Sequence, residues 1–362
     1  MPQLPDRRRT RFLVVSLAAL GGAMLVVGAL AAWASSNGDS SAARDTPRVG
    51  LMHVGLDHVP RSLDGLTLEL EEGFEWDLPD PDVERCLEEK RKSCDLEGES
   101  VKLMWRNLDR SEAAKQAEVF VGEGVDLIVA FEDQSIEAAQ QATVETQTPI
   151  IFLHPSDPVR DGLVDSLARP GTNFTGVFGA RDLVAKHLEY FTLLIPDAER
   201  ILALVNPEDS NYEYLLTETQ SAARRLGVEL VVREASDADD IRRVFRSLEP
   251  DEVDAAMLLS ATLRLNHTAL TLRLGKRAGL PVQAHRKDWV EQGALFSYGS
   301  DLYPIGVEAA RYVDGILDGS APTELSIKEI SDVEFAVNLT TARRLAIEVP
   351  RRMIIRADIV YR

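Results

Sequence analysis

Short apolar strands and amphipathic helices alternate along the chain from residue 48 onward. The stretch VDLIVAF (residues 125–131) is apolar at nearly every position, which is typical of a strand covered on both faces. A helical pattern (133–146) and another apolar strand (148–153) follow it directly. Repetition of this unit predicts a parallel sheet with helices on both sides. Further strands are expected at 48–54, 100–107, 174–179, 200–206, 228–234, 253–260, 280–284 and 293–299.

The alternation runs twice, and a turn separates the two runs. At 362 residues the chain is long for a single core, so two domains are expected. The sequence RPGTN (169–173) combines a proline with residues that tolerate positive φ. We interpret this turn, with the short strand after it, as the passage between two lobes. The predicted fold class is therefore α/β, with two doubly wound, parallel-sheet lobes.

The charge of the chain argues against two kinds of partner. The formal net charge is −19, and four arginines of residues 1–34 are the main basic cluster near the N-terminus. The remainder of the chain is therefore even more acidic. A nucleic-acid partner needs a basic surface, and so does peripheral binding to anionic lipid. Neither is expected here.

An uncharged run near the N-terminus predicts contact with a membrane. Residues 12–34 carry no charge and follow the basic sequence RRRTR. About 20 apolar residues can span a bilayer, and basic residues before the run keep that end in the cytoplasm. AWA (32–34) also fits a signal-peptide cleavage site, so a cleaved signal and a retained anchor both stay open. The rest of the chain, after a polar linker at 35–47, is expected to be extracytoplasmic.

The chain has two cysteines, Cys86 and Cys94, in an acidic and proline-containing excursion of the first lobe at 75–98. Outside the cytoplasm two nearby thiols can form a disulfide. Eight residues of continuous helix would hold them about 12 Å apart, so pairing requires a break between them. A disulfide and two free thiols are the two alternatives that the sequence leaves open.

Candidate ligand-binding residues follow from the predicted sheets. In open parallel sheets the binding crevice lies outside the carboxyl ends of the strands, and helix N-termini there can bind anions. Glu132 and Asp133 could hold a ligand ammonium, although an aspartate before a helix is also a common N-cap. Asp157, in a Ser-Asp-Pro turn, is interpreted as structural. The candidates are His53, Asp133, Ser135, Ser156, Phe178, Asn206, Ser210, Thr262, His285 and Tyr298.

Patterns for catalysis and cofactors are missing from the sequence. His154, Ser156 and Asp157 are too close together for a usual triad, and no GxSxG surrounds the serine. The chain contains no P-loop and no glycine-rich dinucleotide turn after its first strand. The six histidines, His187 among them, are scattered without metal-ligand spacing. We therefore expect no enzyme activity, no cofactor and no metal.

Three longer segments resemble a known family. They are PIIFLHPSDPVRDGLVDSLARPGTNFTGV (149–177), GALFSYGSDLYPIGVEAARYVDGILDGSAPTEL (293–325) and VEFAVNLTTARRLAIEVPRRMIIRADIVY (333–361). In this order they resemble the extracytoplasmic substrate-binding proteins of ABC transporters, of the tryptophan/tyrosine type. The resemblance covers residues 48–362 apart from most of 75–98.

The resemblance implies a type I periplasmic-binding fold, with three crossings near 172–176, 298–302 and 321–327. The first lobe would comprise 48–172 plus 300–322, and the second 173–299 plus 323–362. A monomer would bind an amino acid or a similar small solute in the cleft and deliver it to an ABC permease. Asp133 stands where the family usually has Thr or Ser, and residues 260–262 also depart from its pattern, which leaves the ligand open. The alternative function is that of a membrane-anchored, ligand-sensing ectodomain.

Overall fold

The computed structural model describes residues 46–54, 61–77, 93–99, 101–180, 183–209 and 211–362. The hydrophobic run at 12–34, nearly all of the linker, Cys86 and Ser210 therefore lie outside the described residues. Within those ranges, none of the helices has the length and apolar character needed to cross a membrane. Cys94 is not a free thiol, but its pairing with Cys86 stays a prediction.

The first lobe is built on a seven-stranded sheet in the order β12-β6-β5-β4-β1-β3-β2. All neighbours are parallel except β2 and β3, which are antiparallel. The antiparallel edge strand β2 belongs to the excursion, which the sequence did not predict to be a strand. The strands are β1 (Arg48–Val54), β2 (Ser93–Glu97), β3 (Lys102–Leu108), β4 (Leu127–Phe131), β5 (Ile150–Leu153), β6 (Phe174–Gly179) and β12 (Lys328–Ile330).

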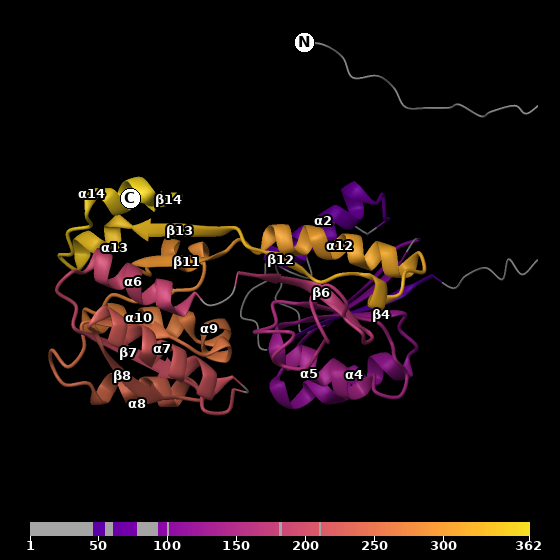
Figure 1. The fold of residues 1–362 in the computed structure, drawn as a ribbon, viewed down its shortest axis with the longest axis horizontal. Coiled ribbons are helices and arrows are strands. Elements are labelled where there is room, and N and C mark those ends of the chain that lie inside the picture. Colours follow the sequence, from indigo (N-terminus) through magenta and orange to yellow (C-terminus); the bar gives the residue numbers. More distant parts are fainter. Residues whose placement is uncertain (1–45, 55–60, 78–92, 100, 181–182, 210) are drawn as a thin grey trace, which may run out of the picture. The chain divides into compact units, whose positions relative to one another are not determined.

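Helices cover both faces of this sheet (Figure 1). Helices α2 (Arg61–Leu68), extended by a π-helical turn at Glu69–Gly73, and α12 (Tyr303–Leu317) pack on one face. Helices α4 (Arg110–Gly122) and α5 (Glu132–Ala142) pack on the other. A Cβ on Gly306 would lie 1.9 Å from the carbonyl oxygen of Ser62, so glycine is required where α2 and α12 meet.

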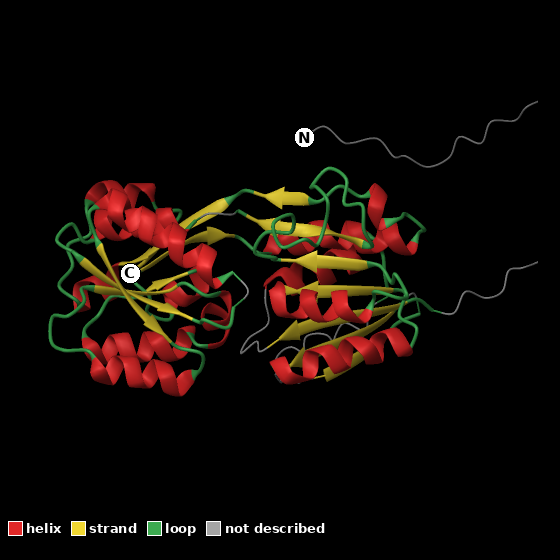
Figure 2. Cartoon of the chain, turned by 60° about the horizontal axis from the view of Figure 1, so that its bottom comes forward, coloured by secondary structure: helices red, strands yellow, loops and turns green. Residues whose placement is uncertain are grey.

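The second lobe contains two groups of strands joined by a bridge between Ala256 and Val282. Strands β8-β7-β9 are parallel, whereas β13 runs antiparallel to β11. Figure 2 shows the strands of each lobe with helices on both sides. The strands are β7 (Arg200–Val205), β8 (Glu229–Glu234), β9 (Ala255–Leu258), β10 (Gln283–Ala284), β11 (Phe296–Ser300), β13 (Val333–Asn338) and β14 (Ile359–Tyr361).

The helices of the second lobe form two layers with separate apolar cores. One layer contains α6 (Val184–Leu194), α7 (Tyr212–Leu226), α13 (Leu339–Arg344) and α14 (Arg351–Arg356). The other contains α8 (Ala238–Ser247), α9 (Ala261–Asn266), α10 (Thr268–Ala278) and α11 (Lys287–Glu291). Together with the sheets this is the α/β architecture that the sequence predicted.

The passage between the lobes lies later than the sequence suggested. Strand β6 pairs with β5 in the first sheet, and β12 pairs with β6, although both were expected in the second lobe. The reason is packing: Phe174 and Phe178 are buried in the core of the first lobe. Strand β6 packs so closely against β5 that a Cβ on Gly176 would lie 2.2 Å from the carbonyl oxygen of Phe152. This close contact requires glycine at position 176. The RPG turn therefore returns the chain to the same sheet.

The expected helix at 262–279 is interrupted at His267, giving α9 and α10. Thr268 donates its hydroxyl to the carbonyl oxygen of Arg264, and Thr271 donates to that of His267. Such hydroxyl bonds to the preceding turn bend helices, which accounts for the break. The interruption leaves Arg264 on a short helix of its own, directly after β9.

Candidate ligand-binding cleft

A cavity of about 590 Å³ lies beyond the carboxyl ends of strands from both lobes. From the first lobe, Glu132 follows β4, and His154 and Ser156 follow β5. From the second lobe, α6, α7 and α9 contribute lining residues, and the segment after β10 adds His285 and Arg286. The apolar wall consists of Leu183, Val184, Ala185, Leu215, Ala261, Leu265 and Leu302, with the rings of Tyr214 and Tyr298.

The predicted site residues divide into three groups. Ser156, His285 and Tyr298 line the cavity. Asp133 and Thr262 line a smaller cavity beside it. The remaining described candidates, His53, Ser135, Phe178 and Asn206, line neither of the cavities and are buried.

The buried candidates have structural surroundings. His53 is 0% exposed and stacks on Phe131 with ring centroids 3.7 Å apart. Asn206 donates to the Thr262 hydroxyl at 3.1 Å and accepts from the backbone N–H of Glu208 at 3.0 Å. Both side chains therefore contact other parts of the protein, and ligand contact by them stays a prediction.

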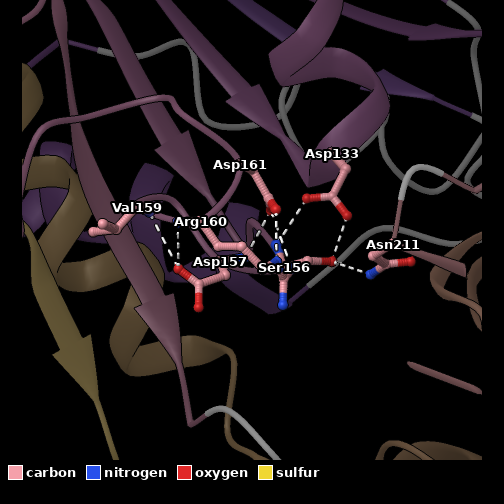
Figure 3. A network of polar contacts seen from close by, with 7 residues as sticks. All are labelled: Asp133, Ser156, Asp157, Val159, Arg160, Asp161 and Asn211. Carbon is pink, nitrogen blue, oxygen red and sulfur yellow. Dashed lines mark hydrogen bonds and ion pairs between the residues drawn. The ribbon is translucent and has the colours of Figure 1, made fainter. Parts of the chain in front are cut away.

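Asp133 fixes a turn and is not the N-cap of its helix. The N-cap of α5 is Phe131. The Asp133 carboxylate accepts two hydrogen bonds from Ser156, from its backbone N–H at 2.7 Å and from its hydroxyl at 2.5 Å (Figure 3). Neither sequence interpretation, ammonium ligand or helix cap, describes this contact. Asp157 is structural as expected, because it accepts from the backbone N–H groups of Val159 and Arg160.

Two contacts join the lobes at the edge of the cavity. Asn211, just before α7, donates its side-chain N–H to the Ser156 hydroxyl oxygen at 2.8 Å. The guanidinium carbon of Arg160 lies 4.2 Å from the ring centroid of Tyr214. The same turn of the first lobe therefore contacts both the beginning and the first turn of α7.

Glu132 is one of three acidic residues that line the cavity, with Asp157 and Glu218. Its φ of 66° is left-handed, which is unfavourable for a residue with a side chain. In the part of the chain that the structure describes, its carboxylate makes no hydrogen bond or ion pair. Burial and the neighbouring Asp133 raise the pKa of Glu132 to about 8. A positive charge in the cavity would stabilise its ionised form.

Three arginines of the second lobe, Arg225, Arg264 and Arg286, line the same cavity. Arg264 lies on α9 and makes no ion pair with any residue in the described ranges, while Arg286 lies 3.8 Å from Asp288. Burial lowers the pKa of the Arg264 and Arg286 guanidinium groups. Arg264 was not among the residues predicted from the sequence. The available signal was its position one helical turn after Ser260, at the end of β9.

Burial favours the neutral form of two histidines of the wall, His154 and His187. Burial, with Arg286 nearby, lowers the pKa of His154 to about 3. Burial lowers the pKa of His187 to about 4. The Nε2 atoms lie 2.9 Å from the Ser62 hydroxyl and 2.6 Å from the Tyr298 carbonyl oxygen, respectively.

The arrangement suits a small zwitterion with an apolar or aromatic part. Both lobes contribute carboxylates and guanidinium groups to the lining, and apolar side chains line the same cavity. The charged residues are Glu132, Asp157 and Arg160 of the first lobe and Glu218, Arg225, Arg264 and Arg286 of the second. Within the described ranges no cluster of three or more His, Cys, Asp or Glu residues could hold a metal ion.

Comparisons with known proteins agree with this geometry. A family model described as "ABC transporter substrate binding protein" matches residues 87–361. A "Tyrosine-binding protein" of Clostridioides difficile is 26% identical over 69% of this chain and 72% of its own length. A "conserved domain protein" of Vibrio cholerae matches 87% of this chain and 100% of its own, with 26% identity and a TM-score of 0.73.

A third match is a Streptococcus pneumoniae domain solved in complex with L-Trp. It covers 87% of this chain and 100% of its own, with a TM-score of 0.72 and 21% identity. At that identity the likeness concerns the fold, which is the type I periplasmic-binding fold expected from the sequence.

Proposed function

Because this chain belongs to the family of ABC transporter substrate-binding proteins, we propose that its cleft captures an amino acid with an aromatic side chain. The family's proteins work outside the cytoplasm and hand their ligand to a membrane permease. The observation that carries the ligand class is that Glu132 of the first lobe and Arg264 of the second line one cavity, influence each other's pKa, and make no ion pair among the described residues.

Glu132 is the proposed partner of the ligand ammonium. The Glu132 carboxylate is partly buried, and a positive charge beside it would compensate the free-energy cost of burying its ionised form. Arg264, with Arg286 beside it in the wall, is the proposed partner of the ligand carboxylate. Charge-assisted hydrogen bonds of this kind contribute about 1.5–3 kcal/mol each, or about 10- to 100-fold in affinity.

The aromatic side chain would occupy the apolar part of the cavity. Tyr214 and Tyr298 lie on its wall with Leu183 and Leu215, and flat rings gain from stacking as well as from burial. The names of the relatives from Clostridioides difficile and Streptococcus pneumoniae, which mention tyrosine and L-Trp, support this choice.

Residues 12–34 are the proposed route out of the cytoplasm. Their uncharged sequence after RRRTR fits either an exported signal or a retained anchor. In both cases the two lobes would face the outside of the cell, where the ligand is captured.

Isothermal titration with ligand analogues tests the proposal. The panel contains L-tryptophan, L-tyrosine and L-phenylalanine, with tryptamine lacking the carboxylate and indole-3-propionate lacking the ammonium. We expect the complete amino acids to bind at least about 10-fold more tightly than either truncated analogue. Binding of sugars alone would contradict the proposed ligand class.

Two substitutions assign the charges separately. Glu132→Gln should weaken the binding of L-tryptophan by about 10-fold or more. It should leave the affinity for indole-3-propionate unchanged, since that analogue has no ammonium. Arg264→Gln should weaken the binding of L-tryptophan to the same extent. It should leave the affinity for tryptamine unchanged, since tryptamine has no carboxylate. Glu145→Gln and Arg246→Gln, at exposed positions away from the cavity, are the matched controls.

A further inference from the structure

We propose that Nδ1 of His187 accepts a hydrogen bond from the aromatic ring of the ligand, so that the cleft selects rings that carry an N–H or O–H group. The preferred substrates would then be amino acids with an indole or a phenol, and phenylalanine would be disfavoured. This inference rests on the proposed function and specifies the ligand of the same cavity.

The tautomer of His187 is fixed by the backbone. Nε2 lies 2.6 Å from the carbonyl oxygen of Tyr298. A carbonyl oxygen can only accept, so Nε2 must carry the hydrogen. Tyr298 lies in β11 and pairs with Phe335 of β13, which holds that carbonyl group rigidly. In the neutral ring the other nitrogen, Nδ1, then has a lone pair and no hydrogen.

The ring stays neutral because it is buried. His187 is 4% exposed, and its burial lowers its pKa to about 4, well below neutral pH. The positive charge of Arg264 also opposes protonation. At pH 7, therefore, Nδ1 acts as an acceptor and cannot act as a donor.

Nδ1 is available to a ligand. His187 lines the cavity, and no residue in the described part of the chain donates a hydrogen bond to Nδ1. Both ring nitrogens of His53 are sealed inside the protein without a partner, whereas Nδ1 of His187 is not sealed. The wall of the cavity thus presents one acceptor of fixed direction beside largely apolar side chains.

His154 does not offer the same selectivity. Its Nε2 lies 2.9 Å from the Ser62 hydroxyl, which can either donate or accept. The tautomer of His154 is therefore not determined by its partner, in contrast to that of His187.

A fixed, buried acceptor discriminates between ligands, because a ligand that leaves it without a hydrogen-bond donor loses binding free energy. A ligand N–H or O–H would replace the water that Nδ1 loses when the cavity is filled. Phenylalanine would fill the same space and leave Nδ1 without a donor. A site with a buried polar group rejects an analogue that lacks the matching group far more strongly than an apolar pocket can.

Titration of matched ligand pairs tests the inference on the unmodified protein. The pairs are L-tryptophan with 1-methyl-L-tryptophan, and L-tyrosine with L-phenylalanine. We expect the donor-bearing member of at least one pair to bind about 10-fold more tightly or better. Equal affinities within both pairs would overturn the role of His187 while leaving the proposed function intact. Failure of all four to bind would overturn the proposed function itself.

Substitution of His187 identifies the acceptor. His187→Phe keeps a ring of similar shape, and it should reduce the preference for the donor-bearing ligand to within about 2-fold without weakening L-phenylalanine. His187→Gln retains a donor and an acceptor and should restore part of the preference. His267→Phe, away from the cavity, is the control. A preference that persists in His187→Phe would assign the selectivity to another group.

Discussion

Glu132 is, at the scale of a single residue, a proposed binding group whose conformation and burial cost stability. Its backbone is left-handed, and such a conformation costs about 1–3 kcal/mol in a residue other than glycine. Its carboxylate is partly buried beside Asp133, with no hydrogen-bond or ion-pair partner among the described residues. Neither feature helps the ligand-free protein to fold. Both become useful when a cation arrives in the cavity.

The raised pKa of Glu132 gives a stability prediction with a definite sign. The pKa rises from 4.5 to about 8 on folding, so the folded state binds the proton more tightly than the unfolded state. The free energy of unfolding must therefore fall as the pH rises through that window. Glu132→Gln should therefore raise the melting temperature of the ligand-free protein more at pH 9 than at pH 5. We expect the increase over the unsubstituted protein to be larger at pH 9 by at least about 2 °C. An equal shift at both pH values would contradict the assignment.

At the scale of the elements, the turn after β5 connects a helix of one lobe to a helix of the other. Asp133 of α5 holds Ser156 by two hydrogen bonds, and Ser156 in turn accepts one from Asn211 beside α7. The bond to Asn211 joins the two lobes and is lost when they separate. The bonds to Asp133 stay within the first lobe.

These two kinds of bond should respond differently to substitution. Asn211→Ala removes only the hydrogen bond from Asn211 to Ser156, which joins the lobes. We therefore expect ligand affinity to fall about 2- to 10-fold through faster dissociation. The melting temperature of the ligand-free protein should change little. Asp133→Ala leaves the backbone N–H of Ser156 unpaired and should lower that melting temperature as well. Stopped-flow dissociation and thermal denaturation of both variants separate the two effects. Unchanged dissociation in Asn211→Ala would show that this contact does not hold the lobes together.

The sequence predicted most elements, because a buried strand must be apolar and a helix must show its period. It predicted the edge of the sheets where the cavity lies and three residues that line it, Ser156, His285 and Tyr298, but not the other lining residues. His53 and Phe178 stand at strand ends and turn into the core, which depends on the local pleat and packing. Arg264 and His187 reach the cavity from helices, so finding them requires the three-dimensional placement of α9 and α6.

At the scale of the whole molecule, the described part of the chain from Thr46 to Arg362 forms one compact unit separate from Met1–Asp45. The boundary is anchored at the start of β1. Lys102 donates its backbone N–H to the carbonyl oxygen of Pro47 at 2.8 Å, and Arg48 donates its backbone N–H to the Asp126 carboxylate at 2.8 Å. Beyond that point β1 is the centre of the first lobe, because it pairs with β3 on one side and β4 on the other.

A protein that starts at Thr46 should therefore fold without the preceding residues. We expect it to be soluble, to melt in one cooperative transition and to bind the same ligand as the full chain. A second protein that starts at Leu51 is the control, since it lacks Arg48 to Gly50 and half of the pairing of β1 with its neighbours. It should melt well below the first or fail to fold. Thermal denaturation with and without L-tryptophan measures both. The protein that starts at Thr46 could instead aggregate, or melt no higher than the one that starts at Leu51. Either result would show that residues before 46 are needed for folding.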